Sequence, residues 1–170
     1  MALSRWKNQV LARVFTALPS LASRWAQGLE ADGAPVPWAP ARKPLRESSV
    51  ALVTTGGVHL VDQKPFDMAD EHGDPTYREV PVDAPRDRLT ITHDYYNHAD
   101  AGKDLNLILP VERLRELEAA GALGRLHPRC YSFMGHIDGP HLQTLVRRSA
   151  PEVARKLVLD EVDCALLVPA

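Results

Sequence analysis

The sequence predicts an α/β fold: a mainly parallel sheet with flanking helices in three layers, preceded by an N-terminal amphipathic helical segment. Short apolar runs such as 50–55 and 163–169 are bounded by charged or turn residues, which is typical of buried strands. A strand, a helix and a strand follow one another over residues 129–168, which is the order of a βαβ unit with parallel pairing. With 170 residues, the chain is long enough for one domain with a full core.

The first 46 residues are expected to form a separate part, ahead of an α/β domain at 47–170. Apolar residues recur at helical spacing as far as Pro19, and these are Trp6, Val10, Leu11, Val14, Phe15 and Leu18. This pattern predicts an amphipathic helix, and we favour its packing on its own domain or on a second subunit over binding to a membrane surface. Residues 31–46 contain four prolines and are predicted to be an extended linker.

The first strand of the domain, 50–55, is predicted to end at Gly56-Gly57. Residues 62–88 are acidic, rich in turn residues and without periodicity, which indicates a long loop. A second strand is expected at 88–92, with Leu89 and Ile91 directed inward.

Two helices and two strands are predicted to complete the domain. Pro110 opens a helix that Gly121 closes, and its apolar face is Val111, Leu114 and Leu117. A third strand covers 130–133. Ser149-Ala-Pro-Glu has the pattern of a capping box with proline in the first turn, which predicts the start of a second helix that leads to the last strand, 163–169.

Composition excludes several classes of protein. The net charge of −2 gives no reason to expect nucleic acid as a partner. No stretch approaches the roughly 18–20 uninterrupted apolar residues of a membrane span. The two cysteines, Cys130 and Cys164, form no disulfide framework, so a cytoplasmic location fits best. Cys164 is expected to be buried in an apolar strand and therefore unreactive.

Polar and glycine residues follow the first two strands and form the candidate site. Gly56 and Gly57 allow the backbone to turn sharply or to approach a ligand, and His59 comes just after them. His93 and Asp94 follow the second strand. Because ligands gather at the carboxyl ends of parallel strands, we expect these five residues to line a substrate site there.

Metal binding is not expected. The segment 93–104 contains two histidines and three aspartates, but their spacing matches no recognised zinc or iron pattern. The acidic residues between Asp67 and Asp74 miss the register of a calcium loop, since His72 occupies the glycine position, so a solvated acidic turn is expected.

Several segments, taken in order, resemble one family. They are Val50-Ala-Leu-Val-Thr-Thr-Gly-Gly-Val-His, Pro65-Phe-Asp-Met-Ala-Asp, Gly73-Asp-Pro-Thr-Tyr-Arg-Glu-Val, Leu114-Arg-Glu-Leu-Glu-Ala-Ala-Gly-Ala-Leu-Gly and Ser149-Ala-Pro-Glu-Val-Ala-Arg-Lys-Leu. Together they resemble the selenoprotein B family of glycine/sarcosine/betaine and D-proline reductases, over residues 36–170.

The resemblance implies a selenol- or thiol-dependent reductive cleavage of a carbon–nitrogen bond, with His59 and His93 as supporting residues. In that family the last strand is followed at once by selenocysteine or cysteine, so the nucleophile is expected just after Ala170 and the catalytic group is not expected within these residues. A codon read as stop in place of selenocysteine would explain this, and it would leave apolar surface exposed around Leu166 and Val168.

The resemblance also implies the ligands and partners. A small amine or amino-acid substrate, a thiol electron-donor protein and partner reductase subunits or a homo-oligomer are expected, with no cofactor other than selenocysteine in the full-length protein. Two alternatives stay open: a non-catalytic binding or assembly module of the same fold, and a metal-dependent hydrolase that uses residues 93–104.

Overall fold

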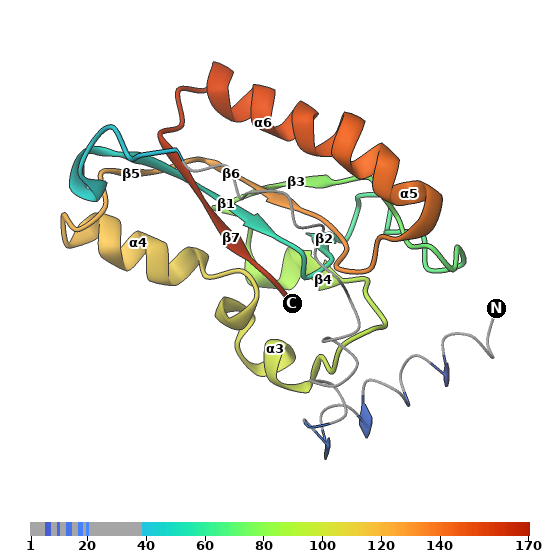
Figure 1. Ribbon diagram of the computed structural model, residues 1–170. Helices are drawn as coiled ribbons and strands as arrows, with labels where there is room; N and C mark the ends of the chain where they lie inside the picture. The colour runs from blue at the N-terminus through green and yellow to red at the C-terminus, as the bar shows by residue number, and fades with distance from the viewer. Residues whose placement is uncertain (1–5, 8–9, 11–12, 15–16, 19, 21–38) are drawn as a thin grey trace.

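The computed structural model describes residues 6–7, 10, 13–14, 17–18, 20 and 39–170 (Figure 1). The strands are β1 (Ser49–Thr54), β2 (Val58–Leu60), β3 (Arg78–Pro81), β4 (Leu89–Ile91), β5 (Arg125–Leu126), β6 (Arg129–Ser132) and β7 (Cys164–Val168). The helices are α3 (Ala99–Lys103), α4 (Val111–Ala119), α5 (Gly139–Thr144) and α6 (Ala150–Leu159). Part of the predicted N-terminal amphipathic helix lies outside the described residues, and the helix stays a prediction.

β1 lies inside the main sheet and is the strand that the others share. On one side it pairs in parallel with β7 along five residues, from Val50 opposite Cys164 to Thr54 opposite Val168. On the other side it pairs in parallel with β5 and then with β6. β3 pairs antiparallel to β6, so the sheet is mixed.

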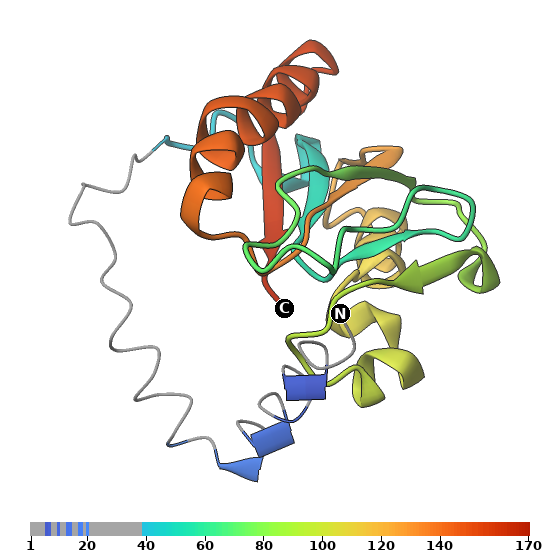
Figure 2. The same ribbon diagram turned by 90° about the vertical axis from the view of Figure 1, so that its right-hand side faces the viewer.

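Alternate residues of β1 enter two apolar clusters, as expected for a strand buried on both faces. Val50 and Leu52 belong to one cluster, together with Leu105, Ile108, Val111 and Leu114 from the chain around α4. Val53 packs on the second cluster, which contains Tyr131, Phe133, Val153 and Leu157. Figures 1 and 2 show α5 and α6 over one side of the sheet and α4 over the other. The α/β class is confirmed, whereas the three-layer description and the boundary at residue 46 stay predictions.

The second predicted strand is present as β4, but it belongs to a separate small sheet. It pairs antiparallel with β2, with His59 opposite Thr90. Leu89 and Ile91 pack against the first apolar cluster, as predicted. The prediction of an irregular loop over 62–88 is wrong at its end, because β3 lies within that range as a strand with a single buried residue, Val80.

The helix predicted to start at Ser149 begins ten residues earlier. α5, a π-helical turn at Leu145–Ser149 and α6 follow one another without a break. Ser149 has helical backbone angles (φ −66°, ψ −47°) and makes no capping hydrogen bond. The capping-box prediction is therefore wrong. Pro151 has no N–H for the helical ladder, and the wider π turn lies directly before it.

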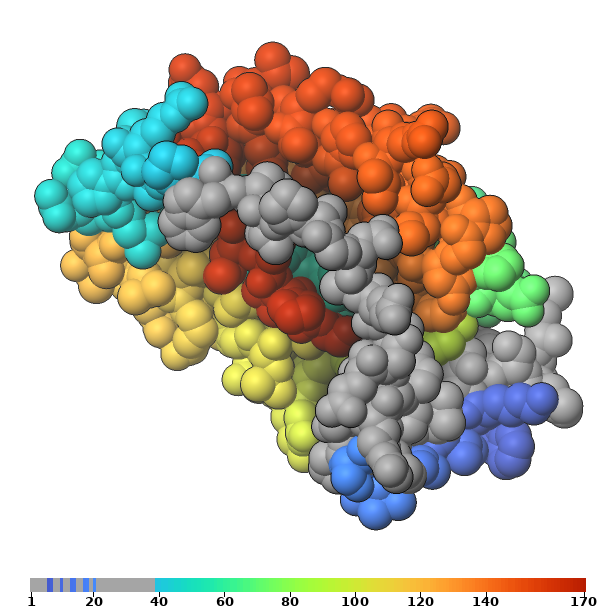
Figure 3. Space-filling model, viewed as in Figure 1, coloured from blue at the N-terminus to red at the C-terminus, as the bar shows by residue number. Residues whose placement is uncertain are grey.

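β7 lies at the edge of the described sheet, because β1 is the only strand that it pairs with. Leu166 is exposed and Leu167 is 69% exposed, while Val168 is half-buried and packs on the core. Figure 3 shows part of this strand, in red, at the surface between α6 and α4. Cys164 is exposed rather than buried, which corrects the prediction from the sequence.

Of the helices in the described ranges, none combines the length and the apolar character needed to cross a bilayer.

Candidate functional site

The carboxyl ends of β1, β6 and β7 are joined by backbone hydrogen bonds. The Thr55 N–H donates to the Val168 carbonyl (3.1 Å), and the Phe133 N–H donates to the Thr54 carbonyl (2.8 Å). The Gly57 N–H donates in turn to the Phe133 carbonyl (2.9 Å). This junction is the edge at which parallel sheets place their ligands, and we call it the strand-end site.

Gly57 brings the end of β4 against the strand-end site. Its φ is +66°, and a Cβ placed on it would lie 2.7 Å from the Thr92 carbonyl oxygen and 2.9 Å from Cβ of His93. Only glycine fits this combination of conformation and close approach. Gly56 donates its N–H to Oγ1 of Thr54 (3.0 Å). Gly57 therefore allows the close approach of His93 to the junction, and a role of either glycine in substrate binding stays a prediction.

His93 is 3% exposed and has an unused hydrogen-bonding nitrogen. The Tyr95 N–H donates to its Nδ1 (3.1 Å), so the neutral ring carries its proton on Nε2. That Nε2 is buried and has no hydrogen-bond partner within the described part of the chain. Buried polar groups are almost always paired, so this donor marks a position where a ligand atom or a water molecule belongs.

Gly135 lies between His93 and the end of β7. A Cβ placed on Gly135 would be 2.7 Å from His93 Nε2, 3.1 Å from the Ala170 carbonyl oxygen and 3.2 Å from the Thr55 carbonyl oxygen. The Ala170 N–H donates to Oγ1 of Thr55 (3.0 Å). The end of β7, Thr55 and the His93 ring therefore converge on one point of the backbone.

Burial first, and the charges of His98 and His136 second, lower the pKa of His93 to about 4, against the opposing effect of Asp94. At neutral pH the ring is uncharged, so it acts as a hydrogen-bond donor through Nε2 rather than as a cation.

A cavity of about 240 Å³ adjoins His93, and its lining comprises Arg13, His93, Asp94, Tyr96, Asn97, His98 and Ala99. The Tyr96 hydroxyl donates to the Gly56 carbonyl (3.0 Å), and its ring centroid lies 4.9 Å from that of His93. Burial raises the pKa of Tyr96 to about 12, so the phenol stays protonated. Asp94 is buried, and the cavity holds one carboxylate and one guanidinium in a space suited to a small molecule.

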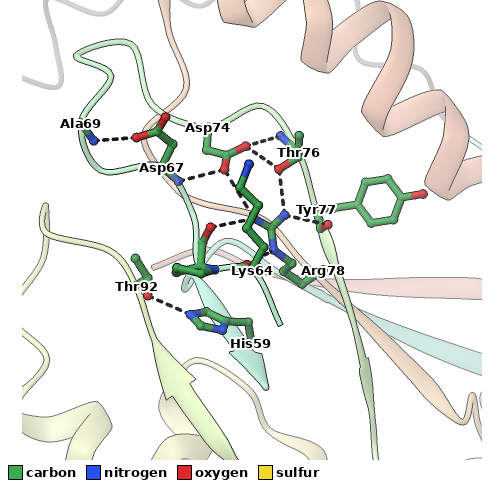
Figure 4. A network of polar contacts seen from close by, with 10 residues as sticks. His59, Lys64, Asp67, Ala69, Asp74, Thr76, Tyr77, Arg78 and Thr92 are labelled. Atoms are coloured by element: carbon green, nitrogen blue, oxygen red, sulfur yellow. Dashed lines mark hydrogen bonds and ion pairs between the residues drawn. The ribbon is translucent and has the colours of Figure 1, made fainter. Parts of the chain in front are cut away.

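His59 lies next to this region but its ring is fully paired. Its Nδ1–H donates to the Leu60 carbonyl (2.8 Å), and its Nε2 accepts from the Thr92 hydroxyl (2.8 Å; Figure 4). The ring is 3% exposed and joins β2 to the end of β4. A role of His59 in substrate binding stays a prediction.

The acidic loop after β2 is held by a buried carboxylate. Asp74 accepts from the backbone N–H groups of Asp67 (2.9 Å) and Thr76 (2.8 Å) and pairs with Arg78 at 3.5 Å (Figure 4). The Arg78 guanidinium lies 4.3 Å from the centre of the Phe66 ring. The prediction of a solvated acidic turn is wrong at Asp74. Across residues 39–170 and the few earlier positions that are described, no group of three or more His, Cys, Asp or Glu side chains could hold a metal ion.

Neither described cysteine lies at the strand-end site. Cys130 is buried in the core, and burial raises the pKa of its thiol to about 12. Cys164 lies at the opposite end of β7, where partial burial and the charge of Asp163 raise the pKa of its thiol.

The sequence analysis missed Thr55, Tyr96, Gly135 and His98 as parts of this region. Gly135 carried a usable signal, because it follows the strand β6 as Gly56 follows β1. Tyr96 and His98 carried none, since their place depends on how the chain after β4 turns back over Gly56.

Comparison with known proteins shows which family this chain is similar to. The model of the glycine/sarcosine/betaine reductase selenoprotein B family matches residues 31–170. D-proline reductase subunit gamma of Acetoanaerobium sticklandii is 35% identical over 133 residues, which cover 78% of this chain and 53% of that protein. Glycine reductase complex component B subunit gamma of Carboxydothermus hydrogenoformans is 35% identical over 104 residues, covering 59% and 24%.

A sarcosine reductase complex component B subunit beta, from Peptoclostridium acidaminophilum, is 35% identical over 95 residues, which cover 54% of this chain and 21% of that protein. No solved structure gives a significant match. The chain spans about half the length of the D-proline reductase subunit and less of the other two relatives. The chain belongs to the glycine/sarcosine/betaine reductase selenoprotein B family.

Proposed function

We propose that this chain forms the strand-end site of a reductase subunit that cleaves a carbon–nitrogen bond of a small amine or amino-acid derivative. Family membership supports the reaction class. The observation that carries the proposal is the position of Ala170, whose carbonyl oxygen and the Nε2 of buried His93 approach the same point at Gly135.

The proposed nucleophile is a selenol or thiol in a residue that would follow Ala170. A group at that position would lie beside the unpaired Nε2–H of His93, which could hydrogen-bond to its anion or to the substrate. In the proposed reaction the carbon–nitrogen bond breaks, the nitrogen keeps the bonding pair and takes one proton, and the carbon takes two electrons and a second proton. Two thiol or selenol groups supply both electrons and both protons and become joined in an oxidised bridge. A thiol protein would then reduce that bridge.

The proposed substrate is a small amine or amino-acid derivative. The cavity beside His93 contains both a carboxylate, Asp94, and a guanidinium, Arg13, and these charges are complementary to a zwitterion. The relatives are named for different substrates, so the choice among them is left to experiment. Other reductase subunits are the proposed partners, and a reducing cytoplasm is the proposed location.

A binding or assembly module of the same fold is the alternative. Cys130 and Cys164, the thiols in the described residues, both lie away from the strand-end site. This observation fits a chain that binds a small molecule without reducing it.

A titration of glycine, sarcosine, betaine and D-proline into ¹⁵N-labelled protein tests the site. We expect one of these ligands to shift the His93 ring signals and to leave those of His127, at the other end of the sheet, unchanged. Equal shifts at both histidines, or none at His93 with any ligand, would contradict the proposed site. Turnover by the full subunit in its complex, with a thiol reductant, would then separate a reductase from a binding module.

A further inference from the structure

The loop after β2 and the chain that follows Gly135 are paired through their backbones. Gly73, in the loop after β2, forms an isolated antiparallel bridge with Ile137. The Asp138 N–H also donates to the His72 carbonyl (3.1 Å). The loop therefore lies against the segment 134–141, which begins at the strand-end site and leads into α5.

Two glycines make this contact very close. Gly73 has φ +83°, and a Cβ on it would lie 1.8 Å from the carbonyl oxygen of His136. Gly139 has φ +48°, and a Cβ on it would lie 2.7 Å from Nδ1 of His72. Each segment thus supplies one glycine that the other segment covers, so the pairing requires a residue without a side chain at both positions.

Two histidine–carboxylate pairs cross the same contact in opposite directions. His72 Nδ1 lies 2.7 Å from Oδ1 of Asp138, and His141 Nε2 lies 2.8 Å from Oδ2 of Asp70. All four side chains are partly or largely exposed to solvent, so both rings can exchange protons with water. The two rings face each other edge to face, with centroids 6.3 Å apart.

Acidic groups dominate the surroundings of these rings. Glu71 lies 4.0 Å from His72 Nε2, and His136 Nε2 lies 3.8 Å from Asp138. The charged residues that line the hollow next to His141 are Lys64, Asp67, Asp70, Asp74 and Arg78. The hydrogen bond to Asp138 raises the pKa of His72 above its usual value. The His72 N–H and the His141 ring lower the pKa of Asp70.

We propose that Asp70, His72, Asp138 and His141 form a pH-sensitive clip that fixes the segment 134–141, and with it Gly135, against the end of β7. The path from the clip to the site is short. The His136 ring stacks on Tyr95 at 4.0 Å, and the Tyr95 N–H donates to His93. The clip stands on its own geometry and does not depend on the proposed reductase function.

The direction of the pH dependence follows from the two shifts. Because the pKa of His72 is raised on folding, its contribution is complete below pH 6.5 and is lost as the pH rises through the raised value. Because the pKa of Asp70 is lowered on folding, its contribution is complete above its ordinary value and is lost as the pH falls through the lowered one. The clip is therefore firmest between the ordinary pKa of Asp70 and pH 6.5, and it loosens as the pH rises through the raised pKa of His72.

A pH titration of the full chain by NMR, from pH 5.5 to 8.5, tests this. We expect the amide signals of Gly73, Ile137 and Gly139 to titrate together with the His72 ring, with a common midpoint above 6.5. In Asp138→Asn the His72 midpoint should shift down toward 6.5, and the three amides should follow it. Amide signals that do not titrate, or whose midpoint is the same in Asp138→Asn, would overturn the proposal.

His72→Gln provides the second variant, in case Asp138→Asn does not fold. Glutamine keeps a donor for Asp138 but cannot titrate, so the pH dependence of the Gly73 and Ile137 amides should be largely lost; its full retention would also overturn the clip. Asp100→Asn is the matched control. It removes an exposed carboxylate, 3.0 Å from Lys103 in α3. The titration midpoints of the His72 ring and of the three amides should stay unchanged in this variant.

Discussion

His59 lies on β2, which pairs with the short strand β4, and His93 follows the end of β4; both are 3% exposed, yet their hydrogen bonds differ. Both nitrogens of His59 are hydrogen-bonded, to Leu60 and Thr92, whereas His93 uses Nδ1 alone and its Nε2 has no partner among the described residues. Burial is therefore no guide to which histidine serves a ligand. An unpaired buried donor is a better guide, because a buried ring with both nitrogens hydrogen-bonded needs no further partner.

The largest expected effect comes from Gly57→Ala, which disturbs both histidines at once. The new Cβ would lie 2.7 Å from the Thr92 carbonyl oxygen in a left-handed conformation, and Thr92 is both the partner of His59 and the neighbour of His93. We expect a loss of about 3–4 kcal/mol in the free energy of unfolding, measured by chemical denaturation.

Gly121→Ala is the matched control for that variant. Gly121 also has a left-handed φ, +70°, but a Cβ there meets no atom within 4 Å. Its loss should be about 1 kcal/mol. Equal losses in the two variants would show that backbone conformation alone explains the role of Gly57.

His59→Leu and His93→Leu separate the two histidines directly. The first variant removes the ring partner of the Thr92 hydroxyl and one of the two donors to the Leu60 carbonyl, which still accepts from the Gln63 N–H, so we expect it to lower the free energy of unfolding by about 2 kcal/mol. The second also removes an unpaired buried nitrogen, so its cost should stay within about 1 kcal/mol. A larger loss of unfolding free energy in His93→Leu than in His59→Leu would refute this distinction between the two histidines.

The pH dependence of stability provides a smaller and independent test of His93. Its pKa is lowered to about 4 on folding, so the unfolded chain binds the extra proton between pH 6.5 and 4, and stability falls as the pH falls through that window. The slope from this one group is at most about 1.4 kcal/mol per pH unit. His93→Gln should flatten the curve there, and an unchanged curve would show that the ring is not buried in its neutral form.

The strands with clear apolar patterns could be predicted from the sequence. The prediction failed where the burial or the limits of an element depend on the elements next to it. The strands predicted at 50–55, 88–92 and 130–133 are present as β1, β4 and β6, because their side chains alternate or are apolar between turns. The run predicted as the last strand, 163–169, has the same pattern, yet β7 lies at the sheet edge, so Cys164 is exposed. No local pattern distinguishes a central strand from an apolar edge strand.

Ser149 shows the same limit for helices. The four residues that begin at Ser149 have the pattern of a helix N-terminus, but the preceding residues already form α5. The serine therefore lies in the middle of a longer helical run. At the site, the sequence predicted His93 and the two glycines from their places after strands. It could not predict that His59 is fully paired, or that Gly135 meets Ala170, because these contacts join segments more than 30 residues apart.

We propose above that a reacting group directly follows β7 and lies beside His93. Reading the coding nucleic acid past the Ala170 codon tests it most directly. The account predicts a selenocysteine (UGA) or cysteine codon in frame immediately after Ala170, followed two codons later by a cysteine codon. A different residue at that position, or an ordinary stop with no open frame beyond it, would contradict the claim and leave the binding module as the better description.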